Sequence, residues 1–133
     1  MKKIITILAL TLSFGAAVHA ETVAELKAAV VEARDSLVIM VKNKDKRTPE
    51  HQKLVKDSAD KVSSMLGKVT VGADKAKAMD EFKTTWTEFK KTRETELVPA
   101  ILAGKQEEGD KLATGIQKER YKKMMDLLGQ IEK

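Results

Sequence analysis

Two arginines stand at positions where the helical pattern predicts buried side chains. The segment of residues 81–105 has helical periodicity from end to end, and it places on one face, at three- and four-residue steps, Phe82, Trp86, Phe89, Arg93 and Leu97. Arg120 occupies an equivalent inner position in the next predicted helix. A guanidinium group donates two parallel hydrogen bonds to a carboxylate or a phosphate, so the pair suits the binding of a small anion.

The candidate site follows from how the last two helices would pack. If they are antiparallel neighbours joined near Lys105, Arg93 lies close to Gln117 and Arg120. The predicted ligand-binding residues are Arg93, Glu96, Gln117, Arg120 and Tyr121. Two adjacent guanidinium groups repel unless an anion lies between them or an acid such as Glu96 compensates. The alternative is that each arginine covers apolar surface with its stem and reaches water with its charged head.

A proline interrupts the same predicted helix. Pro99 has no N–H to donate to the carbonyl of Thr95, and an interior proline costs roughly 3 kcal/mol in a regular helix. The sequence therefore predicts a bend or break between Thr95 and Pro99. The break either tips the last turn over the end of the bundle, burying Ile101 and Leu102, or opens a cleft beside Arg93.

Catalytic and metal chemistry find little support in the sequence. The chain has no cysteine, which excludes disulfides, thiolate chemistry and haem attachment through C-x-x-C-H. His51 has neither the Glu-x-x-His pattern of a di-iron bundle nor an evident serine partner for nucleophilic catalysis. We therefore predict no catalytic residue, no metal ligand and no enzymatic activity.

The first twenty residues have the features of a secretory leader. Lys2 and Lys3 precede a short apolar run from Ile4 to Phe14, and small residues lead to a cleavage point after Ala20. The run is too short to span a bilayer. We expect residues 1–20 to be a cleaved signal peptide, and residues 21–133 to be one periplasmic domain without a membrane span.

The charge pattern argues against a nucleic-acid partner. The chain has 25 basic side chains, of which two lie in the leader, against 20 acidic ones, so the mature net charge is +3. Both signs are interspersed, and no basic block of the kind that binds nucleic acid is present.

Four segments have helical periodicity, and they set the predicted fold. The first runs from Thr22 to Lys42 and the second from Pro49, capped by Thr48, to Gly67. The third runs from residue 73 or 74 to a left-handed Gly104, and the fourth begins at residue 106. Residues expected to face inward include Val23, Leu26, Val30, Ala33, Leu37 and Met40 in the first segment, Leu54, Val55, Ser58, Val62, Met65 and Leu66 in the second, and Ala113, Ile116, Arg120, Met124, Leu127 and Ile131 in the fourth. Short connections between such helices predict an all-α, antiparallel up-down-up-down four-helix bundle.

Residues 82–124, FKTTWTEFKKTRETELVPAILAGKQEEGDKLATGIQKERYKKM, resemble the four-helix-bundle ligand-binding domain of bacterial methyl-accepting chemotaxis receptors and related sensor kinases. The matching residues are Trp86, Phe89, Arg93, Pro99, Ala100, Gly104, Lys105, Arg120 and Tyr121. The resemblance implies a periplasmic sensing module that binds a small anionic ligand between the third and fourth helices or across a homodimer. The sequence contains no second membrane segment and no signalling coiled coil. The expectation is a free-standing relative, with a membrane-bound sensor as a possible partner.

Two other functions stay open. Residues 103–124 also resemble the last helix of the periplasmic four-helix b-type cytochrome, but its early methionine and late histidine ligands have no counterpart here. Met40 and His51 lie near one end of the predicted bundle and would form only a makeshift haem pair. We therefore expect no cofactor. A structural or chaperone-like helical protein is the other alternative, with Val31 and Val38 adding a second apolar column to the first helix.

Overall fold

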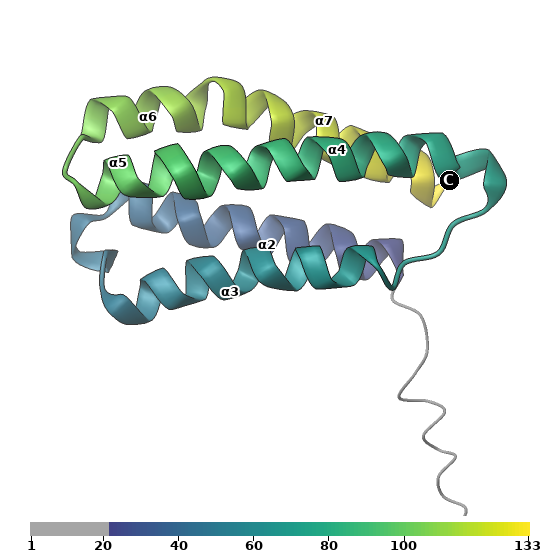
Figure 1. The fold of residues 1–133 in the computed structure, drawn as a ribbon, viewed down its shortest axis with the longest axis horizontal. Helices are drawn as coiled ribbons and strands as arrows, with labels where there is room; N and C mark the ends of the chain where they lie inside the picture. The colour runs from purple at the N-terminus through teal and green to yellow at the C-terminus, as the bar shows by residue number, and fades with distance from the viewer. Residues whose placement is uncertain (1–21) are drawn as a thin grey trace, which may run out of the picture.

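The computed structural model describes residues 22–133, so the leader predicted over residues 1–20 lies outside the described residues. The chain is all-α, and four helical rods pack so that each lies against its neighbour in sequence, consistent with an up-down bundle (Figure 1). The first two rods are α2 (Val23–Lys42) and α3 (Pro49–Leu66). The third is α4 (Ala76–Thr92), a π-helical turn (Arg93–Leu97) and α5 (Val98–Leu102). The fourth is α6 (Gln106–Thr114) followed by α7 (Ile116–Glu132).

The helix ends follow the local signals in the sequence. Thr22 and Glu25 form a capping box at the start of α2, in which each side chain bonds the backbone N–H of the other residue. The Thr48 hydroxyl accepts a hydrogen bond from the N–H of His51, and Pro49 occupies the first position of α3. These caps confirm the predicted starts of the first two helices.

Two glycines offer a matched test of backbone conformation. Gly104 has φ 79°, which confirms the predicted left-handed position, whereas Gly129 lies inside α7, and a Cβ at either site would meet open space. Gly104→Ala is expected to lower the free energy of unfolding by about 1 kcal/mol, because alanine disfavours this φ. Gly129→Ala is expected to raise it by about 1 kcal/mol through helix propensity. Urea unfolding checks both signs, and two changes of the same sign would contradict the assignment.

The core consists of two apolar clusters separated by polar side chains. The larger cluster includes Leu26, Val30, Phe82, Trp86, Phe89, Met124 and Leu128. The smaller one comprises Leu37, Met40, Val41, Val55, Leu97 and Ile101. Ser36, Ser58 and Arg93 are buried at the boundary, since on each helix the two clusters lie on opposite sides of them in sequence. We call these three residues the polar layer.

Two residues predicted to face inward are exposed instead. Leu54 is 47% exposed and Ile116 is 42% exposed, while their chain neighbours Val55 and Gln117 are buried. In the fourth rod, Gln117 takes the inner position instead of Ile116, so the predicted inner column is wrong at Ile116. The rod is also broken just before this position, at Gly115 with φ −99° and ψ −109°, which separates α6 from α7.

The predicted irregularity before Pro99 is confirmed. The chain forms a π-helical turn over Arg93–Leu97, directly ahead of α5, and then continues as a helix. The final turn covers the end of the bundle with Ile101, which is buried, whereas Leu102 is exposed, contrary to the prediction.

Arg47, in the first connection, ties three helix ends together. Its guanidinium donates hydrogen bonds to the carbonyl groups of Met40 (2.9 Å), Val41 (2.9 Å) and Ile101 (3.3 Å). It also donates to Oε1 of Gln106 (2.6 Å) at the start of α6. These bonds satisfy carbonyl groups that a helix C-terminus leaves without a partner inside the helix. The helical pattern of the sequence gives no sign of this role for Arg47.

Candidate functional site

Arg93 reaches across the bundle and bonds to backbone carbonyl groups of the first two helices. Nη1 donates to the carbonyl oxygen of Ala33 (2.7 Å) and Nη2 to that of Val55 (2.6 Å), and the residue is 1% exposed. The Ser36 hydroxyl lies 3.0 Å from the Ala33 oxygen and 3.1 Å from the Ser58 hydroxyl, which lies 3.0 Å from the Val55 oxygen. The guanidinium therefore completes a hydrogen-bonded polar layer inside the protein.

The charge of Arg93 is only partly compensated. Burial lowers the pKa of Arg93 to about 10, and the charges of Glu94 and Asp60 partly offset this effect. The side chain therefore remains cationic at neutral pH. Within residues 22–133 no carboxylate forms an ion pair with it. The carbonyl dipoles of Ala33 and Val55 thus provide its closest partners.

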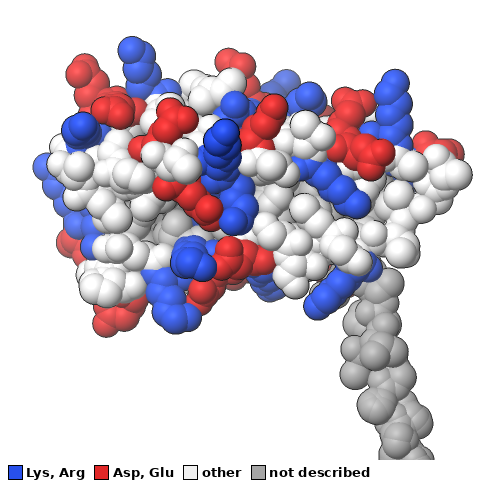
Figure 2. Space-filling view, viewed as in Figure 1, with Lys and Arg blue, Asp and Glu red and all other residues white. Residues whose placement is uncertain are grey.

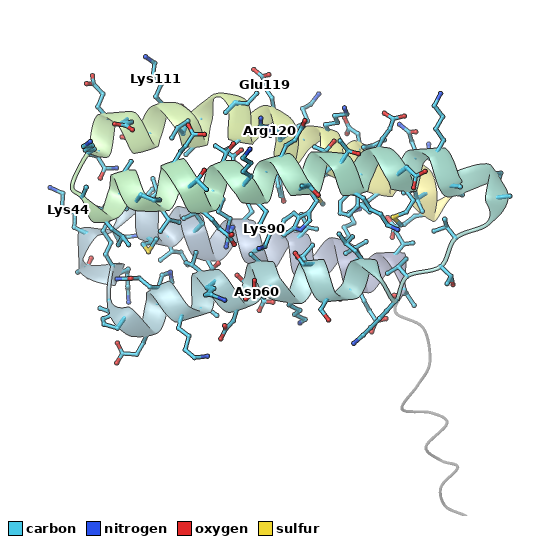
Figure 3. All side chains as sticks on the ribbon, viewed as in Figure 1. Lys44, Asp60, Lys90, Lys111, Glu119 and Arg120 are labelled. Carbon is cyan, nitrogen blue, oxygen red and sulfur yellow. The ribbon has the colours of Figure 1, made fainter. Side chains whose placement is uncertain are left out.

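Arg120 lies between α4 and α7, where Figure 3 labels it. Its Nη1 donates to the Thr92 hydroxyl (2.7 Å), to Oε1 of Gln117 (3.0 Å) and, at 3.4 Å, to the carbonyl group of Glu88. The amide of Gln117 donates in turn to the carbonyl oxygen of Phe89 (2.9 Å). These bonds confirm the predicted antiparallel pairing of the third and fourth rods, and they place Gln117 beside Arg120.

The five candidate residues do not line one cavity. Arg93 points toward α2 and α3, whereas Arg120 bonds to α4 and to its own helix. Glu96 is exposed, and Tyr121 is half-buried with the guanidinium of Arg34 stacked 4.9 Å from its ring centre. Gln117 and Tyr121 line one groove, and Arg93 lines a second one on another side of the bundle. The structure thus groups Gln117 with Tyr121 and Arg120 and directs Arg93 elsewhere.

The first groove, which we call the α2/α7 groove, lies between α2 and the fourth rod and has a volume of about 270 Å³. Its apolar walls come from Leu37, Val38, Val41, Phe89, Leu97 and Ala113. Its polar lining comes from Arg34, Lys42, Asp110, Thr114, Gln117, Lys118 and Tyr121. Three cations against one acid leave positive charge beside apolar surface, a combination that suits a ligand with an anionic group.

The charges of the α2/α7 groove are distributed unevenly along its length. Neighbouring helices in an up-down bundle are antiparallel, so the Arg34–Tyr121 contact marks one end and Lys42 lies toward Asp110 at the other. Arg34 and Lys42 are eight residues apart on α2, which corresponds to about 12 Å along the helix. Lys118 lies between these ends. One end is therefore cationic, and the other combines a cation with an acid.

The second groove lies between α3 and the third rod and has a volume of about 610 Å³. Arg93 and Val98 line this groove. It therefore has the position of the cleft beside Arg93 that was one of the two predicted consequences of the break before Pro99. Its rim charges are already paired: Lys56 with Asp60 (2.7 Å), and Lys90 with Glu94 (3.0 Å) and Asp60 (3.7 Å), the last pair labelled in Figure 3. The hydrogen bond from Lys56 lowers the pKa of Asp60. The lining has the same surplus of two positive charges as the α2/α7 groove, but its three lysines are held in ion pairs and Arg93 bonds to backbone carbonyl groups. In the α2/α7 groove, Lys42 and Lys118 form no ion pair within residues 22–133.

The face of the protein drawn in Figure 2 shows no concentration of one charge. Figure 2 shows lysine and arginine interspersed with aspartate and glutamate over the face in view. No helix among residues 22–133 is long and apolar enough to cross a membrane. Within the same residues, no three side chains of the metal-binding types are grouped as a metal site would need.

The two residues of the haem alternative have other partners. Met40 is fully buried in the smaller apolar cluster. Nε2 of His51 lies 2.7 Å from the carbonyl oxygen of Ser36. Both side chains therefore have structural roles near one end of the bundle.

No protein-family model, curated protein or solved structure matches this chain. The fold is accordingly assigned from the architecture itself, as an all-α protein of four helical rods packed as an up-down bundle.

Proposed function

We propose that this chain is a periplasmic binding module that takes a small anionic ligand in the α2/α7 groove. The observation that carries the proposal is the surplus of cations, Arg34, Lys42 and Lys118 against Asp110, around an apolar trough. Gln117 and Tyr121, two of the residues expected to bind the ligand, line this trough. Arg120 acts as a positioning residue, because its guanidinium donates a hydrogen bond to Oε1 of Gln117.

The groove has the size and polarity of a small-molecule site. Its volume of about 270 Å³ corresponds to roughly nine water volumes and lies just below the range of drug-sized pockets. Apolar walls beside cationic groups exclude water and strengthen their attraction for an anion. A ligand of on the order of ten non-hydrogen atoms would fit.

The sequence supports the cellular setting of this proposal. The predicted leader suits export, and residues 82–124 resemble the sensing domains of chemotaxis receptors and sensor kinases. In such a role the bound module would act on a membrane-bound sensor partner or as a homodimer, without nucleic acid and without catalysis. Ligand binding in the groove would present a changed surface of α2 and α7 to that partner.

The test is the melting temperature of protein purified from the periplasm, measured with phosphate, acetate, glutamate and longer organic acids. At least one anion should raise the melting temperature, since a ligand at one hundred times its Kd adds about 2.7 kcal/mol to stability. Arg34→Gln and Lys118→Gln should each weaken binding of that anion about tenfold, the loss of one charge-assisted hydrogen bond.

Lys123→Gln is the matched control. Lys123 is exposed on α7 and lines neither groove, so the variant removes the same charge from the same helix. It should leave the affinity within about twofold of the wild type. Equal losses in all three variants, or no response to any anion, would contradict the proposal.

A further inference from the structure

We infer that the ligand of the α2/α7 groove is an amphipathic monocarboxylate, with its carboxylate at the Arg34 end and an unbranched apolar chain along the trough. The inference rests on the proposed function and adds the chemical class and the orientation of the ligand. It follows from three features of the groove: the apolar floor, the uneven charge, and the weak present partners of Arg34.

The floor of the groove is part of the core. Leu37, Val41 and Leu97 line the groove and belong to the smaller apolar cluster. Phe89 belongs to the larger cluster and also lines the groove. A hydrocarbon chain lying in the trough would therefore extend both clusters. Burial of each methylene group favours binding, whereas a compact inorganic anion would leave this floor uncovered.

The charges decide which end takes the carboxylate. Arg34 lies at one end and Lys118 beside the middle, while Lys42 at the far end is accompanied by Asp110. One oxygen of Asp110 already accepts a hydrogen bond from Gln106 (2.9 Å). A carboxylate at the Arg34 end meets two lining cations, Arg34 and Lys118, and the acid there, Asp35, is an exposed chain neighbour of Arg34 that does not line the groove. A second carboxylate at the far end would meet Asp110, which lines the groove, as well as Lys42. The groove therefore favours a monoanion over a dianion of the same length.

Arg34 is able to turn toward a ligand. Its present ion pair is with its chain neighbour Asp35 at 3.2 Å, and both side chains are about half exposed. Exposed pairs of this kind contribute little free energy. Its other contact is the face of the Tyr121 ring, which the guanidinium can keep while its edge bonds a carboxylate. Arg34 can thus exchange Asp35 for a ligand at small cost.

The experiment is calorimetric titration of the full-length periplasmic product with straight-chain monocarboxylates from butyrate to decanoate. Affinity should rise about fourfold per added methylene, from about 0.8 kcal/mol each, and level off once the trough is filled. Octanedioate should bind at least about tenfold more weakly than octanoate. 1-Octanol should also bind more weakly than octanoate, because it lacks the charged head group.

Asp110→Asn tests the orientation. Asparagine keeps an acceptor for Gln106 and removes the negative charge, so Lys42 is left to receive a second carboxylate. The ratio of octanedioate affinity to octanoate affinity should rise about tenfold in this variant. An unchanged ratio would overturn the assigned orientation, whatever the affinity for octanoate.

The possible failures are distinguishable. Binding of phosphate or acetate that depends on Arg34 and Lys118, without a gain along the chain-length series, would overturn the amphipathic class and leave the proposed function intact. Affinities along the series that are the same in wild type and Arg34→Gln would show apolar binding without the carboxylate contact and would overturn the assigned orientation. Absence of binding by any anion in the series would overturn both proposals.

Discussion

Trp86→Ala is expected to lower the free energy of unfolding by about 4 kcal/mol, close to the largest effect of a single core truncation. Trp86 is 1% exposed at the centre of the larger apolar cluster, with the ring of Phe89 at a centroid distance of 5.7 Å. Truncation removes its buried area and leaves a cavity that the neighbouring helices fill only in part. For a chain of this size, the melting temperature should fall by on the order of 15 °C.

The indole nitrogen allows packing to be separated from hydrogen bonding. Nε1 of Trp86 donates to the hydroxyl of Ser63 at 3.1 Å. Ser63→Ala removes that partner on an exposed position of α3 and should cost about 1 kcal/mol or less. Urea unfolding of the two variants under identical conditions makes the comparison. Comparable losses in both would show that the hydrogen bond, and not the buried ring, makes the main contribution.

The helices were predictable because each carries several independent signals. Thr48 and Pro49 mark the start of α3 through a side-chain cap and a fixed φ, and Gly104 ends the third rod through a positive φ. The antiparallel pairing about Lys105 predicted Gln117 and Arg120 near Arg93, and they bond to Phe89 and Thr92, within about one turn of that position. Local chemistry and short connections are sufficient for these features.

The departures have physical causes that a pattern of apolar residues does not contain. Ile116 is exposed because Gln117 takes the inner position in α7. The break at Gly115 just before it was also not predicted, since one glycine in a long helical pattern gives little warning of a break. Leu54 is exposed because Val55 takes the inner position at that level of α3. Which of two adjacent apolar residues faces the core depends on a small rotation of the helix about its own axis.

In the candidate site, the directions of the long side chains were not predictable from the sequence either. The position of Arg93 on the inner stripe was predicted, but a guanidinium there can reach any of the three neighbouring rods, and it bonds to α2 and α3. The places of Arg34 and Lys118 in the α2/α7 groove were not predicted, because the predicted site depended only on the pairing of the third and fourth helices. Extending the antiparallel pairing to the first and fourth helices brings Arg34 near Tyr121, and this signal was available in the sequence.

Arg93→Ala is expected to lower the free energy of unfolding by about 3 kcal/mol. The change removes two short hydrogen bonds, to Ala33 and Val55, and opens a void between the two apolar clusters. The effect measures a role in holding the third rod against the first two. Urea unfolding gives the size of the loss, and a variant as stable as the wild type would show that the polar layer does not need the guanidinium.

Arg93→Met separates the volume of this side chain from its charge. Methionine fills most of the same space, while the Ala33 and Val55 carbonyl oxygens keep Ser36 and Ser58 within hydrogen-bond distance. Burial of the cation is itself unfavourable, as its pKa of about 10 indicates, so removing the charge offsets much of the loss of its hydrogen bonds. We expect the methionine variant to lie within about 1 kcal/mol of the wild type. If methionine instead costs as much as alanine, the directed bonds of the guanidinium, and not its bulk, hold the π-helical turn against α2 and α3.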